Sequence, residues 1–150
     1  MAAVIAAVAP EGLIGAEPPV DVHERARRFR ESIDAGAPGG HWVLEEEGRV
    51  VGCADVEQRV AGVFTLGMAI VPEFRGRGQG RMLLDQALMH ARDCGGHKLG
   101  LEVWPENARA IALYARAGFE VEGLRRDHYR RRDGRLRSSL IMARRLDRPA

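Results

Sequence analysis

A glycine-rich loop that opens a helix is the feature that most constrains this chain. Residues 75–80 read Arg-Gly-Arg-Gly-Gln-Gly and lie between a strand-like run and an amphipathic stretch. Glycine at Gly76, Gly78 and Gly80 removes every second Cβ, so the backbone can bend tightly and expose several N–H groups to an anion. The positive end of the helix dipole adds to this attraction. The loop therefore predicts a cradle for a phosphate-bearing ligand.

Two common phosphate-binding loops have different spacings. A Rossmann turn needs G-x-G-x-x-G followed by an acidic residue, and a Walker loop needs Lys followed by Ser or Thr. Residues 75–80 instead follow R-x-x-G-x-G, and no Lys-Ser or Lys-Thr pair comes after them. A solvated turn rich in arginine would have the same composition, so the loop alone does not decide between the two interpretations.

Three further segments flank this loop in an unbroken order. Residues 66–71 read Leu-Gly-Met-Ala-Ile-Val, residues 99–107 read Leu-Gly-Leu-Glu-Val-Trp-Pro-Glu-Asn, and residues 110–119 read Ala-Ile-Ala-Leu-Tyr-Ala-Arg-Ala-Gly-Phe. Together they resemble the core of the GNAT superfamily of N-acetyltransferases, most closely the ribosomal-protein-alanine N-acetyltransferase type. The resemblance extends to the Asp133-Gly134 hairpin and Ile141-Met142, and so covers more than half of the chain.

The resemblance implies an α/β protein with the acyl-CoA N-acyltransferase fold, in which a mixed central sheet has helices on both faces. The 150 residues are expected to form a single N-acetyltransferase domain, residues 1–150. Periodicity and turn residues predict helices near residues 2–9, 21–33, 80–94 and 108–117. They predict strands at residues 41–46, 49–60, 63–71, 99–104, 119–129 and 136–145.

The beginning of the chain departs from the family pattern. Family members usually begin with a strand before the first helix, whereas this chain begins within what resembles that helix. The usual first edge strand is therefore expected to be missing, which would leave residues 41–46 at the edge of the sheet. We expect this edge, or the basic hairpin near the C-terminus, to mediate a homodimer.

The resemblance also implies the cosubstrate, acetyl-CoA, whose pantetheine arm enters a gap between two parallel strands. No metal is implied. Asn107 would hydrogen-bond the pantetheine arm. It could instead act as the N-cap of the helix that follows it, because its one side chain could serve either purpose. The residues that the resemblance assigns to acetyl-CoA are Ala69, Ile70, Val71, Arg75, Gly76, Arg77, Gly78, Gln79, Gly80, Arg81, Met82 and Asn107.

Two residues match catalytic positions of the family. Glu102 would help to remove the proton of the acceptor amine, directly or through water, although a surface carboxylate paired with an arginine would look the same. Tyr114 would protonate the departing sulfur, although an aromatic residue at helical spacing also suits core packing. Neither Cys53 nor Cys94 occupies a family catalytic position, so direct attack of the amine in a ternary complex is favoured over an acyl-cysteine route.

The acceptor is expected to be a small amine or a protein N-terminus. An α-amine with a pKa near 8 loses its proton more easily than a lysine amine with a pKa near 10.4. The chain lacks a signal-peptide pattern and a run long enough to cross a bilayer, which predicts a cytoplasmic protein.

Two alternatives keep the same fold without the chemistry. A CoA-binding sensor would need the loop but neither Glu102 nor Tyr114. A module for an anionic partner is favoured by charge, since residues 71–150 hold 17 basic and 10 acidic side chains. Residues 125–148 are especially rich in arginine, but they lack the interleaved aromatic residues that stack on bases, so nucleic acid is not expected to be a partner.

Overall fold

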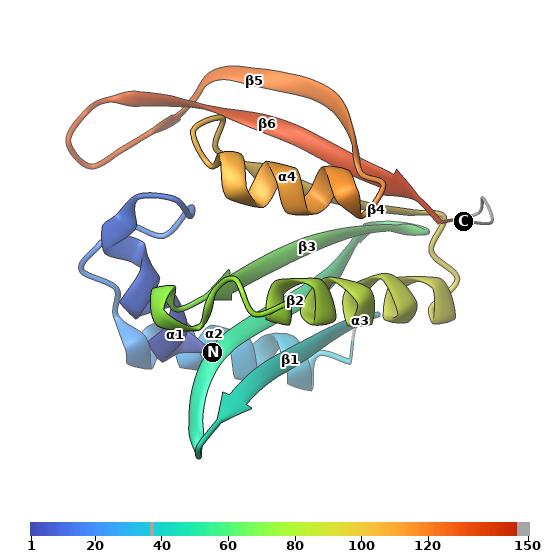
Figure 1. Ribbon diagram of the computed structural model, residues 1–150, viewed down its shortest axis with the longest axis horizontal. Helices are drawn as coiled ribbons and strands as arrows, with labels where there is room; N and C mark the ends of the chain where they lie inside the picture. Colours follow the sequence, from blue (N-terminus) through green and yellow to red (C-terminus); the bar gives the residue numbers. More distant parts are fainter. Residues whose placement is uncertain (37, 147–150) are drawn as a thin grey trace.

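A computed structural model describes residues 1–36 and 38–146. Its centre is a six-stranded mixed sheet in the order β1-β2-β3-β4-β6-β5 (Figure 1). Neighbouring strands are antiparallel except β3 and β4, which run parallel. Each strand overlaps one predicted from the sequence. Their bounds are β1 Gly39–Glu46, β2 Arg49–Val60, β3 Val63–Ile70, β4 Lys98–Val103, β5 Glu120–Arg130 and β6 Leu136–Arg145.

Helices cover both faces of this sheet, which confirms the predicted mixed α/β fold. Helices α3 (Gln79–Asp93) and α4 (Ala108–Arg116) lie on the near face in Figure 1, and α1 (Ala2–Val8) and α2 (Val22–Asp34) lie behind it. Two separate apolar cores lie on the two sides of the sheet. Phe64, Leu84 and Leu99 are buried on the α3 side, and Val4 and Val51 on the α1 side.

The two parallel strands separate soon after they begin. They pair only at Val63–Lys98, Phe64–Leu99 and Thr65–Gly100, although β3 continues to Ile70 and β4 to Val103. Figure 1 shows the two strands diverging beyond this point. Main-chain groups on the facing sides of the diverging strands therefore lack a strand partner, and a gap opens through the sheet.

The strand β1 forms one edge of the sheet, as predicted. Among residues 1–36 and 38–146, α1 is the first element along the chain. The predicted homodimer stays a prediction. No helix among the described residues is both long and apolar enough to span a membrane.

Candidate active site

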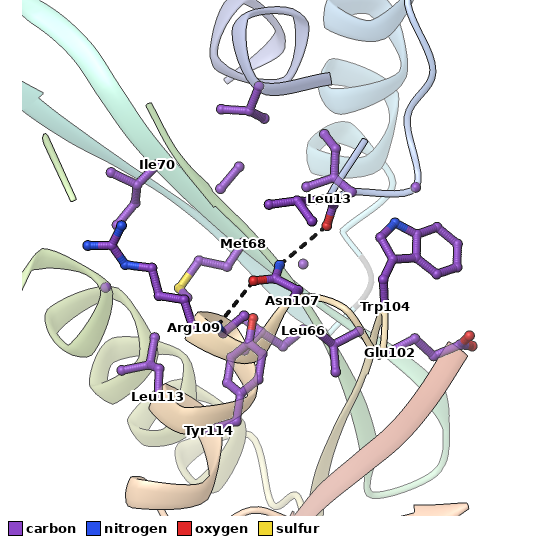
Figure 2. Close-up of a pocket in the computed structure, with 18 of the residues that line it drawn as sticks. Leu13, Leu66, Met68, Ile70, Glu102, Trp104, Asn107, Arg109, Leu113 and Tyr114 are labelled. Atoms are coloured by element: carbon purple, nitrogen blue, oxygen red, sulfur yellow. Dashed lines mark hydrogen bonds between the residues drawn. The ribbon is translucent and has the colours of Figure 1, made fainter. Parts of the chain in front are cut away.

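A cavity of about 1020 Å³ fills the gap between β3 and β4. It extends from the glycine-rich loop, past α4, to the opposite face of the sheet. Figure 2 shows the middle of the cavity, where Met68 from β3 and Leu113 and Tyr114 from α4 converge. The polar groups lie toward its two ends, one at the glycine-rich loop and one beside Glu102.

The N–H groups of residues 76–80 form a row of donors at the start of α3. Nothing in the described part of the chain accepts a hydrogen bond from them. Gly78 has φ of +82°, a left-handed conformation that residues with a Cβ rarely adopt, and it is the N-cap of α3. The geometry of an anion cradle is therefore present. The N–H groups of Arg81 and Met82, which the prediction included, already donate to the carbonyl of Gly78.

The side chains of the loop have partners within the protein. Arg75 donates to the carbonyl of Ile70 at 2.7 Å and to the carboxylate of Glu11 at 2.7 and 2.9 Å. The other polar side chains of the loop are also engaged: Arg77 with Glu46 and the carbonyl of Glu73, Gln79 with Glu46, and Arg81 with Asp85. These arginines hold the loop in shape, and the free donors toward an anion are those of the main chain.

Arg109, which was not predicted, adds an unpaired cation to this end. Its Nη2 atom lies 3.2 Å from the point where a Cβ on Gly76 would stand. In Figure 2 its guanidinium extends from α4 toward Ile70. No salt bridge within the described residues engages it. Its position in the first turn after the Asn107 cap was the available signal in the sequence.

The main chain of β3 alternates between its two neighbours. Val71 donates to the carbonyl of Val51 at 2.9 Å, so Val71 and Ala69 turn their main-chain groups toward β2. Of the predicted set only Ile70 faces the gap, and Met68, which was not predicted, faces it too. The prediction named three consecutive residues, and the alternation of the strand turns the main-chain groups of Ala69 and Val71 away from the gap. Sequence alone does not fix this phase, because it depends on the pairing with β2.

Asn107 caps α4, as one of its two predicted roles required. Its Oδ1 atom accepts from the N–H of Ala110 at 3.2 Å, and its Nδ2 atom donates to the carbonyl of Leu13 at 3.4 Å (Figure 2). The amide thus joins α4 to the loop after α1. Its predicted role toward the pantetheine arm stays a prediction. To bind the arm through Nδ2, Asn107 would have to give up its hydrogen bond to the carbonyl of Leu13.

Tyr114 is buried, with 7% of its surface exposed, and lines the cavity. In Figure 2 its hydroxyl points from α4 into the cavity. Burial raises the pKa of Tyr114 to about 12, because the phenolate would lose its hydration. The hydroxyl therefore stays protonated at neutral pH and can donate a hydrogen bond into the cavity.

Glu102 lies at the opposite end, where three donors surround it. Its carboxylate accepts from Arg125 at 2.6 Å, from the Tyr129 hydroxyl at 2.7 Å and from Ser139 Oγ at 2.6 Å. Partial burial acts to raise the pKa of Glu102, but the hydrogen bonds from Ser139 and Tyr129 and the charge of Arg125 outweigh it and lower that pKa. The arginine pairing anticipated in the sequence is present, and it makes Glu102 a weak proton acceptor.

Asp55 is a second carboxylate at this end, and it was missed. It lines the cavity from β2, and burial, followed by the charge of Glu57, raises its pKa. No hydrogen bond or salt bridge in the described part of the chain engages its side chain. Alternation of apolar and polar residues in β2 was the only signal for it in the sequence.

Arginines of the β5–β6 hairpin fasten the loop after α1 over this end. Arg137 donates to the carbonyl of Gly12 and Arg131 donates to that of Gly15, while Arg132 bonds Glu17 and Pro18. Arg137 and Arg131 also stack on Trp104, with distances to the ring centre of 4.6 and 5.5 Å. These arginines stabilise a wall of the cavity, which weakens the case for a surface that binds an anionic partner.

The cysteines lie outside the reacting centre. Cys53 is buried on β2 in the core beside α1, and burial raises its pKa to about 11, so little thiolate forms at neutral pH. Cys94 is exposed at the far end of α3 from the loop. In the described structure no group of His, Cys, Asp and Glu could hold a metal ion.

Comparison with known proteins agrees with this geometry. The model of the acetyltransferase (GNAT) family matches residues 11–119. The ribosomal protein bS18-alanine N-acetyltransferase of Escherichia coli is 33% identical over 127 residues, which are 81% of this chain and 85% of that protein. The mycothiol acetyltransferase of Propionibacterium freudenreichii is 39% identical over 101 residues, 63% of this chain, but the match spans only 32% of that longer protein.

A solved structure shows the same fold. The Salmonella typhimurium protein yncA, solved with its cofactor acetyl-CoA, superposes with a TM-score of 0.83 at 24% identity, over 99% of this chain and 88% of that one. The family predicted from the loop and its flanking segments is thus confirmed. The chain belongs to the acetyltransferase (GNAT) family.

Proposed function

We propose that this protein is an acetyl-CoA-dependent N-acetyltransferase that acetylates a primary amine by direct attack in a ternary complex. The observation that carries the proposal is the row of unpaired N–H groups at residues 76–80, which leads into the gap between β3 and β4. A diphosphate suits these donors, and an extended arm with amide groups suits the free main chain of Met68 and Ile70. The presence of acetyl-CoA in a protein of the same fold supports this assignment.

The residues fit an acyl transfer. Acetyl-CoA would supply the acetyl group as a thioester. Tyr114 holds a proton in the apolar middle of the cavity, where its hydroxyl can donate to the sulfur as the carbon–sulfur bond breaks. The N–H of Ile70, which faces the gap, can polarise the thioester carbonyl. The high pKa of the Cys53 thiol supports direct transfer over a covalent acyl-enzyme.

We infer that the acceptor is a peptide N-terminus or a small amine. The end of the cavity away from the loop carries two carboxylates, Asp55 and Glu102, which attract an ammonium group. The name of the E. coli relative, an alanine N-acetyltransferase of a ribosomal protein, favours a peptide N-terminus. We further propose that the protein acts in the cytoplasm as one domain, with the β1 edge or the basic hairpin forming a homodimer.

An amine panel with acetyl-CoA tests the proposal. The wild-type protein should release CoA with at least one short peptide that has a free N-terminus or with one small amine, and mass spectrometry should find one added acetyl group. Tight CoA binding, measured by calorimetry, without acetylation of any member of a broad panel would contradict the enzymatic function. That result would favour the CoA-binding sensor.

A further inference from the structure

Asp55 belongs to a row of residues that crosses the sheet at the level of the gap. His41 on β1, Asp55 on β2 and Gly67 on β3 are directly opposite one another in register. The last β3–β4 pair is Thr65–Gly100. Two residues further along each strand, Gly67 on β3 is therefore level with Glu102 on β4. Residues opposite in register share a face of the sheet. Asp55 and Glu102 therefore flank the gap on one face, with Gly67 between them.

Gly67 leaves open the space between Asp55 and the gap. A Cβ at position 67 would stand 2.7 Å from Oδ1 and 3.0 Å from Oδ2 of Asp55. Gly67 lies within β3 and is not one of the glycines with positive φ, so its backbone conformation does not require glycine. Its effect is steric: the Asp55 carboxylate reaches across β3 because no side chain stands there.

The two carboxylates differ in how many partners they have. Glu102 accepts from Arg125, Tyr129 and Ser139. Asp55 accepts no hydrogen bond from any described residue, and neither of its oxygens is sealed from the cavity. A carboxylate with free lone pairs takes up a proton more readily than one whose oxygens already accept hydrogen bonds.

Charged groups from three elements face Asp55. They are His41 on β1, Arg25 on α2, and Glu57 and Arg59 on β2 itself. Burial is the largest effect and raises the pKa of Asp55, and the charge of Glu57 raises it further. Each of the positive groups lowers it by a smaller amount. The raised pKa of this carboxylate lies closer to the pKa of an amine, as a general base requires.

We propose that Asp55 is the general base that takes the proton of the acceptor ammonium, while Glu102 positions the wall formed by Tyr129 and Ser139. This inference rests on the proposed N-acetyltransferase function. An N–H bond of the ammonium breaks and the proton goes to a carboxylate oxygen of Asp55. The freed nitrogen lone pair forms the bond to the acetyl carbon as the carbon–sulfur bond breaks and sulfur keeps its electron pair. A second proton passes from nitrogen to sulfur through Tyr114, and Asp55 releases its proton to water.

The role of a base depends on whether the acceptor arrives protonated. An α-amine with a pKa near 8 is mostly protonated at pH 6.5 and mostly neutral at pH 9. We therefore expect Asp55→Asn to lower kcat/KM for a short peptide with a free N-terminus about 100-fold at pH 6.5, within the usual range for a lost general base. At pH 9 the loss should shrink to roughly 10-fold or less, because the amine no longer needs a base.

Two controls separate this role from a structural one. Glu120→Gln changes an exposed carboxylate on β5 that does not line the main cavity, and it should leave kcat/KM within about twofold of wild type, as a change outside the catalytic site should. The Kd for CoA should be unchanged in Asp55→Asn, because Asp55 lies at the other end of the cavity. Gly67→Ala, whose Cβ would displace the carboxylate, should reproduce the same pH-dependent loss without altering Asp55 itself.

The outcomes are distinct. An equal loss at pH 6.5 and pH 9, or wild-type activity of Asp55→Asn at pH 6.5, would overturn the assignment of Asp55 while the enzyme assignment stands. If Asp55→Asn does not fold, wild-type activity of Gly67→Ala at pH 6.5 would overturn it. Absence of acetylation by the wild-type protein would overturn the proposed function, and this inference with it.

Discussion

The two ends of the cavity differ in the kind of group that has no partner within the protein. At the glycine-rich loop the cations are mostly paired, Arg75 with Glu11 and Arg81 with Asp85, and the unpaired groups are main-chain N–H donors. At the far end the unpaired group is an anion, the carboxylate of Asp55. Side chains fixed by one another give the loop a stable shape, whereas the main chain and a lone carboxylate remain for the ligands.

This difference separates the two substrates by charge. A diphosphate is attracted to one end and an ammonium to the other, and apolar residues such as Met68 and Leu113 line the space between them (Figure 2). A thioester and an amine that enter from opposite ends would meet beside Tyr114. Substitutions in the middle of the cavity should therefore affect turnover most, those at the loop should affect CoA binding, and those of the two carboxylates should also change stability.

Tyr114 stands where the two ends meet. We expect Tyr114→Phe to lower kcat about 100-fold, because the variant removes the only proton that this side chain can donate. The Kd for CoA should stay within about twofold of wild type, since the ring keeps its packing against Phe119. Steady-state kinetics and calorimetry would check both values. An unchanged kcat would mean that sulfur receives its proton from another source.

Gly78 tests the loop end through its backbone. Gly78→Val should raise the Kd for CoA roughly 5- to 30-fold, because a left-handed residue with a Cβ costs about 1–2 kcal/mol and the donor row would turn to relieve it. Gly134→Val is a matched control, since Gly134 has φ of +83° against +82° for Gly78 and neither has an atom near its Cβ position. An equal Kd in the two variants would contradict the cradle.

Arg109 tests whether a free side chain adds to the main-chain donors. Arg109→Gln should raise the Kd for CoA about fivefold and weaken its dependence on salt, because one charge contact with phosphate is lost. Arg126→Gln, a change on the exposed β5 strand, should leave the Kd and its salt dependence unchanged. If both variants bind CoA like wild type, the main chain alone holds the anion.

The two carboxylates should affect stability in opposite directions. Asp55 has a raised pKa, so its ionisation destabilises the fold as pH rises above its ordinary value of 3.8, and Asp55→Asn should raise Tm at pH 7 by about 2–4 °C. Glu102 has a lowered pKa, so it stabilises the fold above its ordinary value of 4.5. Glu102→Gln should therefore lower Tm at pH 7 by about 2–4 °C.

The difference for Asp55 should disappear as pH falls below about 3.8, and the difference for Glu102 should shrink as pH falls from 4.5 through the lowered pKa of the folded state. Thermal unfolding followed by circular dichroism at pH 7 and pH 3.5 would measure them. A lower Tm for Asp55→Asn at pH 7 would show that the carboxylate has a stabilising partner, and the contrast between Asp55 and Glu102 would be lost.

The fold could be predicted well because local signals in the sequence agreed with one another. Turn residues separate the strands, and Gly95 and Gly118, both of positive φ, follow the ends of α3 and α4 close to the predicted bounds. Asn107 caps α4, as its residue type favours. These features depend on neighbours within a few positions, which a single sequence displays directly.

The site was harder to predict, because its residues come together only through the sheet. Asp55 reaches the gap because Gly67 stands opposite it on another strand, and Arg109 reaches the loop from α4. The side chains of Arg75 and Arg77 pair with Glu11 and Glu46, partners distant in the sequence that local patterns do not indicate. Each of these outcomes depends on long-range pairing, which periodicity does not encode.

A crystal structure of the complex with acetyl-CoA tests the central claim most directly. The account predicts the diphosphate against the N–H groups of residues 76–80, the arm between β3 and β4, and the sulfur within hydrogen-bond distance of the Tyr114 hydroxyl. Acetyl-CoA bound outside this gap, or a sulfur remote from Tyr114 with the gap closed, would contradict it.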